Sequence, residues 1–259
     1  MVNNLIFFYK LIATNIRSSV ALRGSFLLQT LFMALNNLTF FITWWIFFAN
    51  FKEINGWTIH EMEAMYGLVA GSFGLSVIVA GGMSELGKMI NDGGLDSYLV
   101  QPKNVLIHIL GSRSKVSGWG DILSSFFLLY LSGYLKIELL PFIFIFYITS
   151  ALLFIASAIT YQSLSFWFGN IDQLSRQMFE FVITFSVYPQ SIFPSFMKLI
   201  FFTIIPAALI STVPVQFFMS FNILDFVTVL LGCVILLSTS FMIFYRGLKH
   251  YESGNKILH

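Results

Sequence analysis

Long apolar runs separated by short polar segments recur along almost the whole chain. Runs near 20 residues are long enough, at about 1.5 Å per residue, to cross a hydrocarbon layer of about 30 Å as a helix. The pattern predicts an all-α integral membrane protein, folded as a single domain over 1–259. We expect six transmembrane helices, at 26–48, 65–83, 119–135, 141–168, 178–188 and 225–245.

The first residues have a different pattern, in which polar and apolar positions recur three and four apart. Lys10, Thr14 and Arg17 share one helical face, while apolar side chains occupy another. Amphipathic helices of this kind are typical of segments that lie in the membrane interface. The pattern therefore predicts an interfacial helix over 3–23.

The segment 189–222 contains four of the six prolines, although its middle is apolar enough for a seventh crossing. A seventh crossing would place Arg246 and Lys249 on the outer side, whereas basic residues favour the cytoplasmic side of short loops. We expect instead a re-entrant or surface helical hairpin on the outer side, with its broken backbone satisfied by protein or water. With six crossings, both termini are cytoplasmic.

The composition supports a lipid environment and excludes several function classes. Hydrophobic side chains make up 57% of the chain and charged ones only 10%, with 31 phenylalanines, which leaves too little polar surface for a water-soluble globule. The 14 basic residues nearly balance the 12 acidic ones, so no nucleic-acid partner is indicated. The lone Cys233 excludes an intrachain disulfide.

One stretch, "GGMSELGKM", has Gly82, Gly87 and Lys88 at the spacing of a nucleotide-binding P-loop. Met89 stands where the magnesium-binding Ser or Thr belongs, and an apolar span precedes the motif instead of a strand. The histidines are scattered, so no metal-ligand cluster emerges. We therefore expect the chain to bind no cofactor or metal and to have no enzymatic activity.

A few polar and small residues interrupt the predicted spans. Asn36 and Asn37 lie near the middle of the first span, where they predict either an interhelical hydrogen bond or a pathway-lining role. Gly67 and Gly71 in the second span, with Gly74, form a small-residue face for close helix packing or, as a second possibility, for a dimer interface.

Charged residues avoid the centres of the predicted spans, because Asp121, Glu180 and Asp225 all fall near predicted ends. Ion-coupled carriers usually need ionisable groups at membrane depth. This distribution favours transport of an amphipathic or apolar substrate, such as a lipid, drug or peptide, with energy supplied by another chain. A carrier or channel without an ATPase, and a membrane-bound assembly factor, remain alternatives.

Three local sequences carry a resemblance: "GGLDSYLVQPKN" at 93–104, "YPQSIFP" followed by "IIPA" in the proline-rich segment, and "YRGLKHYESGN" at 245–255. Together with the predicted spans, the chain resembles the permease subunits of ABC-2 type ABC transporters. In that family the cytoplasmic segment between spans two and three, 84–118 here, forms a coupling helix that docks into a separate ATPase. The resemblance implies these docking residues: Glu85, Asp92, Gly94, Leu95, Asp96, Tyr98, Leu99 and Pro102.

The chain departs from the resemblance at Gly94, where a glutamate is expected. The resemblance implies a permease of an ATP-driven exporter in a bacterial-type inner membrane, working by alternating access. It also implies two partners in addition to membrane lipid: an ABC ATPase that binds ATP and Mg, and a second permease protomer, identical or paralogous. The pathway would then lie between protomers, lined by the first, second and fifth spans.

Overall fold

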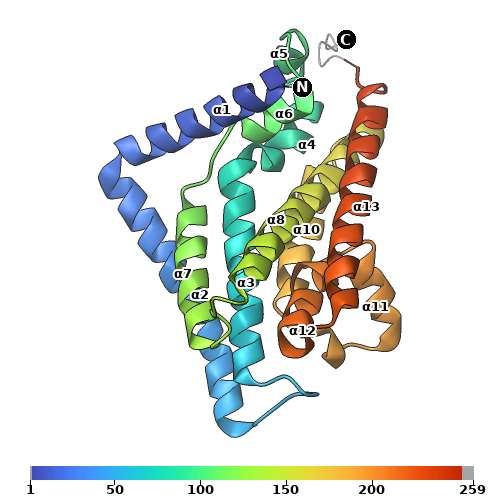
Figure 1. The fold of residues 1–259 in the computed structure, drawn as a ribbon. Helices are drawn as coiled ribbons and strands as arrows, with labels where there is room; N and C mark the ends of the chain where they lie inside the picture. The colour runs from blue at the N-terminus through green and yellow to red at the C-terminus, as the bar shows by residue number, and fades with distance from the viewer. Residues whose placement is uncertain (1, 253–259) are drawn as a thin grey trace.

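The computed structural model describes residues 2–252, and side chains from residue 4 onward. Within this range the regular structure is helical, apart from an isolated bridge between Ile54 and Trp57. The all-α prediction is therefore confirmed (Figure 1).

The chain begins with two helices joined at a sharp bend. The predicted helix over 3–23 is present as α1 (Val2–Ala21), and α2 (Arg23–Asn50) follows after Leu22, whose ψ of 63° is not helical. Figure 1 shows α1 crossing one end of the bundle obliquely and α2 running away from it. The bend separates the amphipathic helix from the apolar one.

Four helical segments of the described chain are long and apolar enough to cross a membrane. They are α2, α3 (Ile59–Val79), α8 with α9 (Leu140–Ser163 and Ser165–Phe168) and α13 (Ile223–Leu248). The other two predicted spans form α7 (Ser117–Leu131) and α10 (Asp172–Ser186), of 15 residues each. At about 1.5 Å per residue these two helices are shorter than a hydrocarbon layer of about 30 Å.

Helix α3 is the centre of the bundle. It packs against α7 and α8, and most of its side chains are buried. Helices α2 and α13 lie on opposite sides of the bundle in Figure 1 and expose apolar faces, with Phe32, Ile46 and Val234 among the exposed side chains. In a membrane protein such faces are suited to lipid or to another apolar chain.

Short helices occupy the two ends of the bundle. At one end lie a 3-10 helix (Gly81–Glu85), α4 (Leu86–Asn91), α5 (Asp96–Leu99) and α6 (Val105–Gly111), together with the ends of α1 and α13 (Figure 1). At the other end lie α11 (Ser195–Phe202), α12 (Val213–Ser220) and the α2–α3 connection. We call these the coupling end and the hairpin end.

The proline-rich segment forms a broken helical hairpin. After a 3-10 turn (Gln190–Ile192), α11 leads to a non-helical tip, and a π-helical turn (Ala208–Thr212) continues into α12. Polar side chains satisfy the irregular backbone, because Tyr161 donates to the carbonyl of Ile204 and Ser150 donates to that of Ile210 at 2.8 Å. The π-helical arm is buried, so it is an internal element and not a surface helix.

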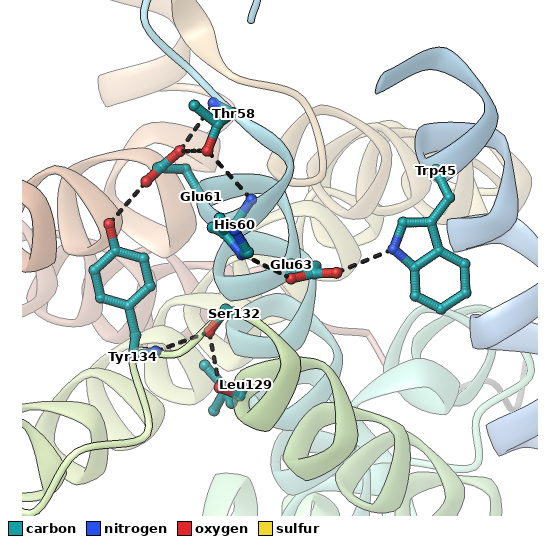
Figure 2. A network of polar contacts seen from close by, with 8 residues as sticks. All are labelled: Trp45, Thr58, His60, Glu61, Glu63, Leu129, Ser132 and Tyr134. Atoms are coloured by element: carbon teal, nitrogen blue, oxygen red, sulfur yellow. Dashed lines mark hydrogen bonds and ion pairs between the residues drawn. The ribbon is translucent and has the colours of Figure 1, made fainter. Parts of the chain in front are cut away.

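A polar network joins three helices at the hairpin end (Figure 2). The Glu61 carboxylate accepts from the backbone N–H of Thr58 and from the Tyr134 hydroxyl, both at 2.8 Å, which caps α3 and ties it to the chain after α7. The Trp45 indole donates to Glu63 at 3.0 Å and ties in α2. The described residues hold no group of three or more His, Cys, Asp or Glu side chains placed to bind a metal.

Candidate docking segment and lateral cleft

The predicted docking residues from Asp92 to Pro102 form what we call the docking segment. It is built on a turn that follows α4. Gly93 has a φ of 75°, a left-handed conformation that favours glycine. The backbone N–H of Leu95 then bonds to the carbonyl of Met89 at 3.1 Å, and the Leu95 side chain is fully buried beside Leu86 and Ile109. Leu95 therefore anchors the segment and does not face a partner.

Two further predicted docking residues make contacts within the chain. The Tyr251 hydroxyl donates to Asp96 at 2.9 Å, and the Tyr98 ring packs edge-on against His108 with centroids 4.8 Å apart. Nearby, the Asn104 amide donates to the Tyr245 hydroxyl at 2.7 Å. These contacts connect the docking segment to α6 and to the end of α13. Residues 253–255 of the C-terminal motif lie outside the described residues.

The other predicted docking residues are more accessible. Glu85 is partly buried, with an oxygen 3.7 Å from the Arg113 guanidinium. Leu99 is 40% exposed, and its neighbour Val100, which sequence analysis did not single out, is 83% exposed. Together with three exposed predicted residues they form what we call the docking surface: Asp92, Gly94, Leu99, Val100 and Pro102.

The P-loop-like residues occupy a helical environment. Gly82 lies in the 3-10 helix that follows α3, and a side chain there would overlap the carbonyl oxygen of Ile109. Lys88 lies in α4. A phosphate-binding loop needs a preceding strand and a free ring of backbone N–H groups. Gly82 thus serves close packing against α6.

His108 predicts a pH dependence of the coupling end. Its ring lies against Phe7 and Tyr98, and its Nδ1 is buried with no hydrogen-bond partner among the described residues. Burial lowers the pKa of His108 below its usual value. Because the buried ring is held neutral, the unfolded chain takes up a proton on this histidine more readily than the folded chain does. The free energy of unfolding is therefore highest above the ordinary histidine pKa of about 6.5 and decreases as the pH falls below it. We expect the melting temperature to drop between about pH 7.5 and about pH 5.5, and to drop less in His108→Phe. An equal drop in both proteins would contradict this role.

A lateral cleft of about 480 Å³ opens between α2 and α10, with α3 at its floor. Asn36 and the exposed Phe40 line it from α2, and Glu180 and Thr184 line it from α10. The three helices correspond to the predicted first, second and fifth spans. Both predicted pathway residues line the cleft, Asn36 as an exposed side chain on its wall and Asn37 as a buried one.

Asn37 lies deeper than Asn36 and makes an interhelical contact. Its side-chain amide donates to Asp121 at 2.8 Å and to Ser124 at 2.9 Å, both on α7. Asp121 also lines the cleft, is only 1% exposed and bonds to Asn37 near the middle of the 28-residue α2. Asp121 lies in the second turn of α7, near the start of that helix as the sequence indicated, and it is enclosed by the bundle.

The predicted glycine face packs within the chain. A methyl group on Gly67 would lie 3.2 Å from Leu129, and one on Gly71 would overlap the Tyr147 ring. Both glycines are buried against α7 and α8. Helix packing, the first of the two predicted roles, accounts for them, and they do not reach a surface that a second protomer could contact.

The cleft continues toward the hairpin end as an aromatic groove of about 280 Å³. Trp44 and Phe47 line it from α2, and Tyr188 lines it from the end of α10. The Trp44 and Tyr188 rings meet edge to face with centroids 5.5 Å apart. Tyr66 and Phe40 line both parts, so the cleft and the groove form one surface that is polar near Asp121 and aromatic farther along.

Comparison with known proteins identifies the family. A family model described as "ABC-2 family transporter protein" matches residues 34–254. The match begins within α2 and runs past the end of α13, so it includes the docking segment and the cleft. No curated protein and no solved structure matched the chain. The chain therefore belongs to the ABC-2 transporter family.

Proposed function

We propose that this chain is the membrane-spanning permease subunit of an ATP-driven exporter. The observation that carries the proposal is the docking surface, where Leu99 and Val100 are exposed on a segment that Leu95 and Asp96 anchor within the chain. Exposed apolar side chains rimmed by polar ones are typical of protein contact sites. Family membership makes an ABC ATPase the expected partner.

The proposed topology has six crossings with both termini in the cytoplasm. The ends of α1 and α13 lie beside the docking segment, and the basic residues Lys88, Lys103 and Arg113 belong to the same end. That distribution agrees with the preference of Lys and Arg for the cytoplasmic side. The short α7 and α10 cross within the bundle, and the hairpin enters from the outer side without crossing.

The proposed mechanism is alternating access driven from the docking surface. ATP and Mg bind to the ATPase pair, whose closure would push the docking segment. Leu95 is packed in the core and Asp96 is bonded to Tyr251, so a displacement of the segment would be passed to α6 and α13. Packed elements that have two discrete arrangements can amplify a small shift at one site.

The substrate pathway is proposed to follow the cleft, closed by a second protomer, identical or paralogous. The cleft is open at the surface of one chain, since Asn36, Glu180 and Tyr188 on its walls are exposed. Its lining is mostly apolar with a few polar groups, as expected for an amphipathic substrate. The exposed face of α13 is left for membrane lipid.

The test is to express the chain with a candidate ABC ATPase from the same genome and purify both in lipid nanodiscs. We expect a stable complex in which ATP hydrolysis differs from that of the ATPase alone. Transport by the chain alone, with no ATPase bound, would overturn the proposal in favour of a carrier or channel. A stable complex that alters hydrolysis but moves no substrate would overturn it in favour of an assembly role.

A further inference from the structure

The side chains that line the cleft and its aromatic groove carry acidic groups but no basic ones. Asp121 and Glu180 are the carboxylates, and no Lys, Arg or His occurs among the lining residues of the described chain. Glu180 is exposed and lies within electrostatic reach of Lys115. Asp121 has no cation within ion-pair distance among residues 4–252. The carboxyl group of the cleft that has no basic partner is therefore that of Asp121.

The hydrogen bonding of Asp121 is incomplete in a specific way. Its Oδ1 accepts from the Asn37 amide at 2.8 Å, which fixes the carboxylate at the cleft floor. Its Oδ2 is buried and has no hydrogen-bond partner among the described residues. A buried carboxylate oxygen without a donor is unfavourable, and a cation or a strong donor would relieve it. The arrangement leaves one acceptor without a donor in a side chain that lines the cleft.

The aromatic groove beside Asp121 is suited to the apolar part of a molecule whose cationic or donor group meets the carboxylate. Trp44, Phe47 and Tyr188 present aromatic rings, which attract apolar groups and also organic cations. The cleft volume of about 480 Å³ falls in the range of about 300–1,000 Å³ that is typical of small-molecule sites. Aromatic faces beside a buried carboxylate favour positive over negative ligands.

We infer that the cleft selects amphipathic organic cations, with the cationic group near Asp121 and the apolar part in the aromatic groove. The inference rests on the proposed permease function, because it names the substrate class of the same pathway. Glu180 at the wall would attract the cation before it reaches Asp121. Asn37 acts as a positioning residue, because its side-chain amide donates to the Asp121 carboxylate and holds it in place.

The test compares two ions of the same shape and opposite charge, tetraphenylphosphonium and tetraphenylborate. Binding of each is measured by equilibrium dialysis to the full chain in nanodiscs, with empty nanodiscs subtracted. We expect the wild type to bind the cation at least about tenfold more tightly than the anion. We expect Asp121→Asn to weaken cation binding at least about tenfold and to leave anion binding unchanged or tighter.

Asp225→Asn is the matched control, because Asp225 begins α13 and lines neither part of the cleft. It should bind both ions as the wild type does. Equal affinity of the wild type for the two ions would overturn the inference, and this comparison does not depend on whether any variant folds. Unchanged cation binding in a folded Asp121→Asn variant would also overturn it.

These outcomes are separate from those of the proposed function. Binding of the ions needs no ATPase, whereas the permease role is tested by complex formation and altered hydrolysis. If the chain binds both ions equally but forms a complex with altered ATP hydrolysis, only the substrate class is overturned. If the chain prefers the cation but binds no ATPase, only the permease role is overturned.

Discussion

Replacing Gly74 by leucine is expected to prevent recovery of folded protein. A methyl group at this position would lie 2.5 Å from the carbonyl oxygen of Gly118 and 2.8 Å from the Cβ of Asp121. These atoms belong to the backbone or the root of a side chain on α7, so they cannot rotate away. Overpacking of a tight core costs about 1–3 kcal/mol or more, and a leucine here also separates α3 from α7.

The measurement is the yield of monodisperse protein in detergent and its apparent melting temperature. Gly24→Leu is the matched control, because no atom lies within 4 Å of the corresponding position at Gly24. It should melt as the wild type does. A Gly74→Leu variant with wild-type yield and melting temperature would show that the α3–α7 contact can open, contrary to the packing described.

The same glycines illustrate what the sequence could predict. Gly67, Gly71 and Gly74 recur at helical spacing in an apolar run, which predicts a face for close helix approach, and they do pack closely. The spacing could not indicate which helix approaches, because a partner within the chain and one in a second protomer place the same demand on the sequence. Only the fold assigns the face to α7 and α8.

In the docking segment, helical spacing alone did not predict which side chains are buried and which are exposed. Leu95 and Leu99 are four positions apart, so a helical pattern places them on one face. The helix is a single turn, Asp96–Leu99, and Leu95 precedes it in the turn that returns to α4. One leucine is therefore buried and the other exposed. The exposure of Val100 follows from the same turn and has no distinct signal in the sequence.

The burial of Asp121 among the helices could not be predicted for a related reason. Its place near the start of an apolar run indicated the end of a span. Its burial depends on how α7 packs against its neighbours, and the backbone N–H of Lys115, before α7, bonds to the carbonyl of Val77 in α3. The connection is thus folded back against α3, and the carboxylate meets Asn37 of α2. The polar Asn37 was recognised from the sequence, but its partner was not.

The double substitution Leu99→Asp with Val100→Asp is expected to release the ATPase from the permease during co-purification. Apolar anchors at the centre of an interface often contribute about 2 kcal/mol or more each, and a buried unpaired charge adds a further penalty. The affinity should therefore fall about 100-fold or more. The permease itself should stay folded, because both side chains are exposed and neither belongs to a buried cluster.

Ile137→Asp is the control, because Ile137 is 86% exposed in the α7–α8 connection, away from the docking segment. It introduces the same kind of charge and should leave the ATPase bound. Tyr251→Phe separates docking from transmission, since it removes the hydrogen bond to Asp96 without changing the docking surface. It should retain the ATPase and reduce the effect of the permease on hydrolysis. If the folded double variant, Leu99→Asp with Val100→Asp, still holds the ATPase as tightly as the wild type, the docking surface is refuted, whatever the result at Tyr251.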